Sequence, residues 1–183
     1  MITTLPKSLE VNGVEYEIES DFRAILDICI ALNDIELTNE ERILTALAIF
    51  YPDFNNMPLD DYEEALKKCF WFIDWGEDFD NKPATKLVDW EQDFKYIVAP
   101  INRVIGKEIR DVEYMHWWTF LSAYMEIGEC TFQQIVAIRD KLKRHKPLEK
   151  YEREWYRRNK DLVDFKTAYT DVETDLLKQW GGG

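Results

Sequence analysis

The chain has 183 residues, 46% hydrophobic and 14% aromatic, enough for one domain whose core needs neither metal nor disulfides. Its formal charge of −13 makes the surface repel phosphate backbones and anionic lipid headgroups, which argues against nucleic acid and membrane partners. It has no signal-like start or bilayer-length apolar run, and Cys29, Cys69 and Cys130 lie apart from one another. We therefore expect a cytoplasmic protein with buried, reduced thiols.

The N-terminal stretch alternates apolar and acidic residues around Asn12-Gly13, a dipeptide that favours the type I′ turn of a two-residue hairpin. Pairing Val11 with Val14 places the apolar side chains on one face and the glutamates on the other. A β-hairpin over residues 1–19, packed on the rest of the domain, is therefore predicted.

Helical periodicity begins near Ser20 and Asp21, either of which can cap a first helix. Thr38 and Glu41 have capping-box spacing and precede a second helix. This second helix is predicted to end before Tyr51, which is followed by proline.

Pro58 suits the first turn of a third helix, and Gly76 suits its end. A fourth helical stripe runs to Gly106 and should break or kink at Pro100. The apolar pattern predicts a further helix over residues 113–127.

Thr131 and Gln134 again have capping-box spacing before a helical stripe, and Lys146-Pro147 marks the next boundary. The sequence thus predicts a mainly α protein, a compact helical domain of about six to seven helices with an N-terminal β-hairpin. Its expected segments are the hairpin at 1–19, a helical core at 20–146, a charged helical extension at 147–180 and a disordered tail at 181–183.

No catalytic motif emerges, because Gly13, Gly76, Gly106 and Gly128 are isolated from one another and no serine has nucleophile-elbow flanks. We therefore expect no enzymatic activity and no cofactor. Glu113 and His116 form half of a di-metal Glu-x-x-His set on the predicted helix, and His145 lacks the matching glutamate. A structural histidine is favoured, with a metal-binding helical enzyme as the alternative. The acidic run at 78–82 has Pro83 where a calcium loop needs glycine, so a solvated loop is expected.

Residues 139–160 hold ten basic and four acidic side chains, a local charge of +6 that leaves −19 for the remainder. Three interpretations stay open: an ordinary solvated helix, a surface that docks on an acidic protein or a second copy, and a single-stranded nucleic acid site. Any self-association through this charge split should weaken as salt rises.

Seven tryptophans are many for this length, and Phe70-Trp71-Phe72 with Trp75 distributes aromatics around a helix instead of along one stripe. Aromatic side chains at surfaces are common anchors of protein interfaces. The candidate partner-binding residues are Trp71, Trp75, His116, Trp117, Trp118, Tyr151 and Trp155.

Several short runs resemble the phage "gene product fifteen" proteins, which are encoded in the tail-module region of long-tailed phages and related prophages. The most specific run is His116-Trp117-Trp118 followed by Phe120. The others are the hairpin with Asp21-Phe22-Arg23, Tyr51-Pro52-Asp53, Phe70-Trp71-Phe72, Asp93 with Tyr96-Ile97, and Phe132 with Ile135 and Ile138-Arg139. Residues 99–109 follow the family loosely, and the segment after Arg158 is longer than its pattern.

This resemblance implies a role in tail assembly, in the host cytoplasm while virions are built. The implied protein is a chaperone or adaptor that shields the tape-measure protein or brings tail-tube subunits to it. A minor structural component of the tail is the alternative. The resemblance supplies no catalytic residues.

Overall fold

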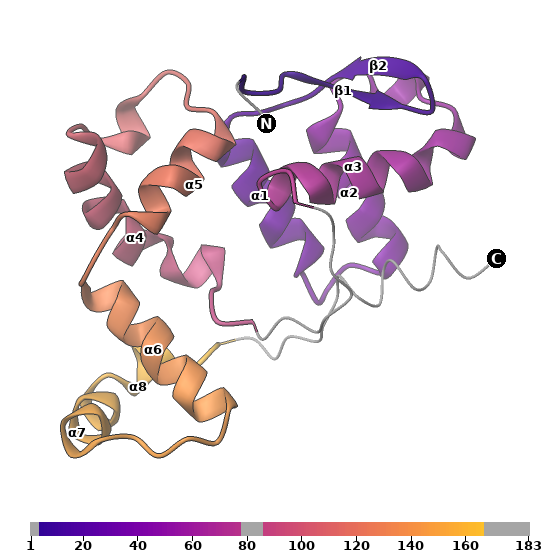
Figure 1. The fold of residues 1–183 in the computed structure, drawn as a ribbon. Helices are drawn as coiled ribbons and strands as arrows, with labels where there is room; N and C mark the ends of the chain where they lie inside the picture. The colour runs from indigo at the N-terminus through magenta and orange to yellow at the C-terminus, as the bar shows by residue number, and fades with distance from the viewer. Residues whose placement is uncertain (1–3, 78–85, 167–183) are drawn as a thin grey trace. The chain divides into compact units, whose positions relative to one another are not determined.

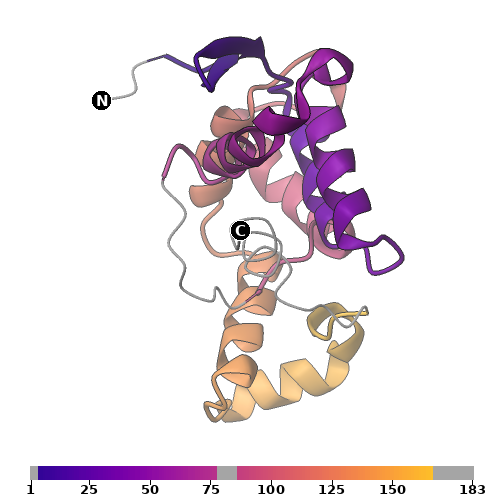
Figure 2. The same ribbon diagram turned by 90° about the vertical axis from the view of Figure 1, so that its right-hand side faces the viewer.

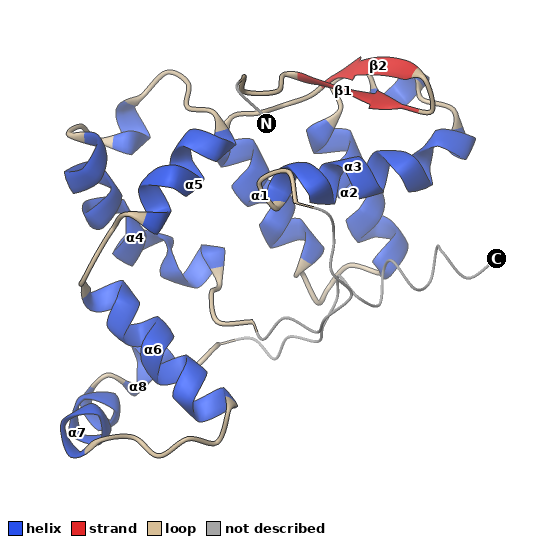
Figure 3. Ribbon diagram, in the orientation of Figure 1, coloured by secondary structure: helices blue, strands red, loops and turns tan. Residues whose placement is uncertain are grey.

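Helices and one hairpin make up the computed structural model, which describes residues 4–77 and 86–166 (Figure 1). Eight α-helices follow the two strands within these residues, which confirms the mainly helical class with an N-terminal hairpin (Figure 3). The 78–82 run and the 181–183 tail lie outside the described residues. The elements are β1 Ser8–Val11, β2 Val14–Glu17, α1 Phe22–Leu32, α2 Asn39–Phe50, η1 Phe54–Asn56, η2 Leu59–Asp61, α3 Tyr62–Ile73, α4 Trp90–Ile105, η3 Ile109–Asp111, α5 Trp117–Met125, α6 Thr131–Lys143, α7 Lys150–Arg158 and α8 Lys160–Val163.

Two compact units share these elements. The described part of the first unit comprises residues 4–77 and 113–121, and that of the second comprises residues 86–112 and 122–166. The predicted segment boundaries at residues 19 and 146 stay a prediction. No helix in the described segments combines the length and apolar character that a membrane crossing requires.

The hairpin forms as predicted, with β1 and β2 antiparallel and Val11 opposite Val14. Asn12 and Gly13 have φ values of 48° and 84°, the two positive values that a type I′ turn requires. The Asn12 side chain donates to Asp61 Oδ1 over 2.8 Å. This hydrogen bond fastens the tip of the hairpin beside α3.

Local sequence signals place the first helices. Asp21 caps α1 by accepting from the Arg23 backbone N–H, and the predicted Thr38–Glu41 capping box forms at the start of α2. α1 packs on α2, α2 on α3, and β1 on α3. The third helix starts later than predicted, because Pro58 precedes the 3-10 turn η2 and α3 begins only at Tyr62.

The fifth helix also begins later than predicted. Residues 113–116 are not helical, because Asp21 and His116 form an antiparallel bridge. Met115 N donates to Asp21 Oδ2 over 3.0 Å, and Met115 O accepts from Phe22 N over 2.9 Å. These contacts across more than ninety residues hold the segment extended, so α5 starts at Trp117.

In the second unit α4 continues through Pro100 instead of breaking there, and it ends at Gly106 with φ 77°. The predicted capping box at Thr131 is absent, since Thr131 is the first helical residue and Cys130 is the N-cap. The predicted break between helices at Lys146-Pro147 is confirmed, since α6 ends at Lys143 and α7 begins at Lys150. Figure 2 shows α7 and the short α8 beside α6, which α8 contacts.

Candidate functional site

The Trp117-Trp118 pair caps the C-terminal end of α3. The last carbonyls of a helix have no partner within the helix. The Trp118 indole Nε1 donates to Phe72 O over 2.8 Å, and the Trp117 Nε1 donates to Ile73 O over 2.9 Å. Both side chains are buried, 4% and 1% exposed respectively. The most specific run of the sequence therefore serves the core of the first unit.

Trp75 completes this helix end. Asp74 N donates to Phe70 O, Gly76 N to Trp71 O and Trp75 N to Phe72 O, the pattern of a Schellman motif. In that motif the left-handed position favours glycine, yet here it holds Trp75 with φ 63°. A left-handed residue with a Cβ costs about 1–2 kcal/mol. The fold thus holds a tryptophan, 41% exposed, in a strained backbone conformation.

His116 ties the segment before the hairpin to α5. Its Nδ1 accepts from the Trp118 backbone N–H over 3.0 Å, so Nδ1 carries no proton and the Nε2–H donates to Pro6 O over 2.9 Å. Burial lowers the pKa of His116, and nearby Lys7 lowers it further. The neutral imidazole therefore uses both ring nitrogens in hydrogen bonds, Nδ1 as the acceptor and Nε2 as the donor.

The prediction that Glu113 and His116 lie on a helix was wrong, because both residues precede α5. Glu113 is also exposed, whereas His116 is buried. No lone pair of His116 is available to a metal ion, given its two hydrogen bonds. Across residues 4–77 and 86–166, no group of three or more histidine, cysteine, aspartate or glutamate side chains could hold a metal ion.

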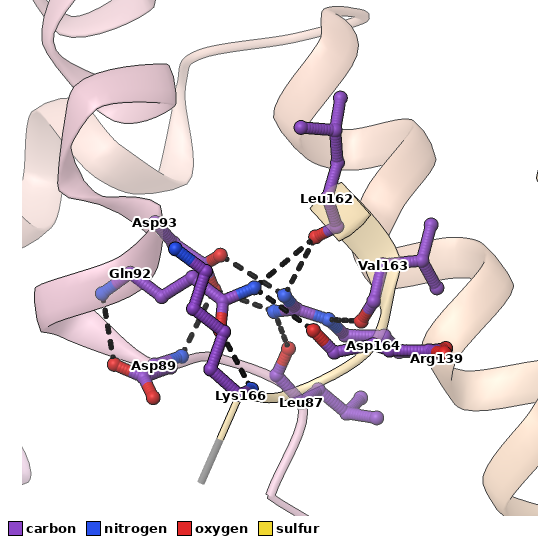
Figure 4. Close-up of polar contacts among 9 residues, drawn as sticks. All are labelled: Leu87, Asp89, Gln92, Asp93, Arg139, Leu162, Val163, Asp164 and Lys166. Carbon is purple, nitrogen blue, oxygen red and sulfur yellow. Dashed lines mark hydrogen bonds and ion pairs between the residues drawn. The ribbon is translucent and has the colours of Figure 1, made fainter. Parts of the chain in front are cut away.

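The polar centre of the second unit is a buried ion pair between Arg139 on α6 and Asp93 on α4 (Figure 4). Arg139 Nη1 and Nη2 lie 2.5 Å and 3.0 Å from the two carboxylate oxygens. The remaining guanidinium N–H groups donate to Leu87 O, Leu162 O and Val163 O. All five donors of the guanidinium are thereby satisfied.

Contacts from Gln92 and Arg139 fix the chain after α8. Gln92 Nε2 donates to Asp164 O over 3.0 Å, and Gln92 Oε1 accepts from Lys166 N over 3.1 Å (Figure 4). The Phe165 ring lies 4.2 Å from the Arg139 guanidinium carbon. Arg139 was counted with the solvated basic segment, and this interpretation was wrong because its side chain is 2% exposed.

α7 is held against α6 by Glu152, whose carboxylate accepts from Lys141 Nζ at 2.7 Å through both oxygens. The same carboxylate completes a capping box with Glu149. The hydrogen bond from Lys141 lowers the pKa of Glu152 and raises that of Lys141. Tyr156 donates to Asp164 Oδ1 over 2.7 Å, so both ends of α7 have side-chain contacts that fix it.

A groove of about 530 Å³ lies between α6 and α7. Tyr151, which is 66% exposed, is one of its lining residues. We call this hollow the α6–α7 groove, and its lining is Glu129, Cys130, Gln133, Gln134, Ala137, Ile138, Tyr151 and Glu152.

The seven candidate partner-binding residues divide by burial. His116, Trp117 and Trp118 are buried inside the first unit, and their hydrogen bonds there stabilise its fold. Trp71 is half-buried with its ring 5.8 Å from that of Trp118, and Trp155 is half-buried on α7. Only Trp75 and Tyr151 of the seven are exposed. Partner binding through the four accessible side chains stays a prediction.

Similarity to a known protein family covers residues 1–165 of the chain. No curated protein and no solved structure matches it. The model of the family described as "Bacteriophage Gp15 protein" matches residues 1–165, which include the hairpin, the capped end of α3 and the buried ion pair of Arg139 with Asp93. The chain belongs to the bacteriophage Gp15 protein family.

Proposed function

We propose that this phage protein is a non-enzymatic tail-assembly protein, a chaperone or adaptor that acts on the tape-measure protein and tail-tube subunits. Membership of the Gp15 family supports a phage role. The tail-module resemblance of the sequence supports the assembly role, in the host cytoplasm before the tail is complete.

Trp75 is the observation that carries this proposal. Its indole is 41% exposed although its backbone position favours glycine. Strained residues of this kind cluster at binding sites, and tryptophan is among the most frequent energetic anchors of protein interfaces. The capped end of α3 holds the indole on a rigid support, which reduces the entropy lost on binding.

The charge of the chain suits a reversible grip on apolar segments. A net charge of −13 keeps the protein soluble. Exposed aromatic side chains such as Trp75 and Tyr151 can contact the apolar face of a partner helix that would otherwise aggregate.

Co-expression with an aggregation-prone tape-measure segment tests the proposal. The wild-type chain should raise the soluble fraction of that segment and co-purify with it. Trp75→Ala should lose much of this effect, whereas Ile35→Ala, a change at another exposed apolar side chain of the same unit, should not. The proposal fails if the wild type gives no gain in solubility and no co-purification.

Mass spectrometry of purified virions then separates two fates of the protein. An assembly chaperone should be absent from finished virions. A fixed stoichiometric copy number in the tail would instead identify a structural component.

A further inference from the structure

The α6–α7 groove has features of a preformed binding surface. Its lining includes the apolar side chains of Ala137 and Ile138 and the exposed side chain of Tyr151. α7 is fixed to α6 through Lys141 and Glu152, so the wall that carries Tyr151 is in place before anything binds. A rigid wall lowers the entropic cost of association.

Basic side chains border the tyrosine on α7. Lys150 and Arg157 lie on one side of the helix at a seven-residue step, and Arg158 lies two turns beyond Tyr151 in the same row. All three are exposed, and none has an ion pair within the described parts of the chain. Glu154 is an acidic neighbour on this side of α7. We call Lys150, Arg157 and Arg158 the basic rim.

We propose that the α6–α7 groove and its basic rim bind an acidic amphipathic helix of another polypeptide. The volume of about 530 Å³ suits a few apolar side chains from one helical face. Acidic residues on the flank of that helix would then face the basic rim. This deepens the proposed function, on which it rests, by naming the chemistry of one segment that the protein recognises.

Two other occupants fit these observations less well. A phosphate backbone offers no apolar side chains to the part of the lining formed by Ala137 and Ile138. A second copy would need to offer an amphipathic helix, yet the large apolar side chains exposed on the α-helices described are Val104, Met125 and Tyr151, each on a different helix. A separate polypeptide is therefore the occupant that the surface favours.

Fluorescence anisotropy with the full chain tests the proposal. The probe is a labelled 18-residue peptide with leucine and phenylalanine on one helical face and glutamate on the other, and its twin carries lysine for glutamate. The glutamate peptide should bind at least tenfold more tightly than its twin, and its affinity should fall as salt rises.

Two variants separate shape from charge. Ala137→Trp fills the groove and leaves the basic rim, and it should weaken binding at least tenfold. Reversal of the rim by Lys150→Glu, Arg157→Glu and Arg158→Glu should also weaken binding at least tenfold. The matched control reverses the exposed residues Lys67 on α3, Lys95 on α4 and Lys107 in the loop after α4, and should bind as wild type. Circular dichroism checks that each variant keeps its helices.

Several results would overturn the assignment: equal binding of the two peptides, undiminished binding by Ala137→Trp, or a single-stranded oligonucleotide that competes at the same site. A doubled mass in light scattering that Ala137→Trp abolishes would make a second copy the occupant and overturn it too. If the peptides fail while the chain still solubilises the tape-measure segment, the groove assignment falls alone. If both fail, the proposed function falls with it.

Discussion

Replacing Arg139 by methionine should destabilise the second unit more than any surface change. The substitution leaves the Asp93 carboxylate buried without its counter-charge, and Leu87 O, Leu162 O and Val163 O each lose a donor. Removing one partner of a buried ion pair costs about 3–5 kcal/mol. That is a large share of the roughly 5–15 kcal/mol by which a domain is stable.

The assay is urea unfolding followed by circular dichroism, with hydrogen exchange to locate the effect. Amides of residues 160–166 should exchange faster in Arg139→Met, whereas α2 in the other unit should be unaffected. Arg144→Met is the matched control at the C-cap of the same helix, because its pair with Asp140 lies at the surface and is worth at most about 1 kcal/mol.

A double-mutant cycle makes this test stricter. Adding Asp93→Leu to Arg139→Met removes the orphaned charge, so the double variant should be more stable than the sum of the two single losses predicts. A loss below about 1 kcal/mol for Arg139→Met, or additive losses in the cycle, would show that the buried ion pair does not stabilise the second unit in this way.

The remaining predictions concern the first unit. Trp75→Gly should be about 1 kcal/mol more stable than Trp75→Ala in urea unfolding, because only alanine keeps a Cβ at the left-handed position; an alanine variant of equal or greater stability would contradict that conformation. Trp117→Phe and Trp118→Phe should each cost about 1–3 kcal/mol by the same assay, since a carbonyl at the end of α3 loses its indole donor, and unchanged midpoints would count against the capping role. His116 has a lowered pKa, so its contribution to stability should be complete above its unfolded value of about 6.5 and decline as the pH falls below it toward the folded value. Urea midpoints between pH 7.5 and 5 measure this decline, and His116→Asn, which cannot titrate but offers an acceptor to the same backbone N–H, should lack it; identical pH profiles would exclude His116 as the cause.

Local signals in the sequence predicted the local structure well. Asn12-Gly13 predicted the hairpin turn, and Thr38 with Glu41 predicted the start of α2. Both predictions succeeded because each structure depends only on residues that are close together in the sequence. Capping-box spacing failed at Thr131 because the helix starts one residue earlier than that spacing requires. The spacing alone could not show whether Cys130 or Thr131 is the N-cap residue.

Long-range contacts explain what the sequence did not reveal. The start of α5 depends on backbone pairing of residues 113–116 with Asp21, which no helical periodicity can report. The inward orientation of Trp117 depends on carbonyls that α3 presents. Arg139 looked like one of ten basic residues on a charged segment, and its buried partner Asp93 lies 46 positions away in the chain. An arginine on an otherwise apolar helical face was the one available sign.

Affinity capture tests most directly whether this protein acts by binding phage tail polypeptides. The tagged chain and its Trp75→Ala variant would be expressed with the neighbouring gene cluster, and the captured proteins quantified by mass spectrometry. We expect the tape-measure and tail-tube proteins to be enriched with the wild type and strongly depleted with the variant. Capture of neither protein, or equal capture by both chains, would contradict it.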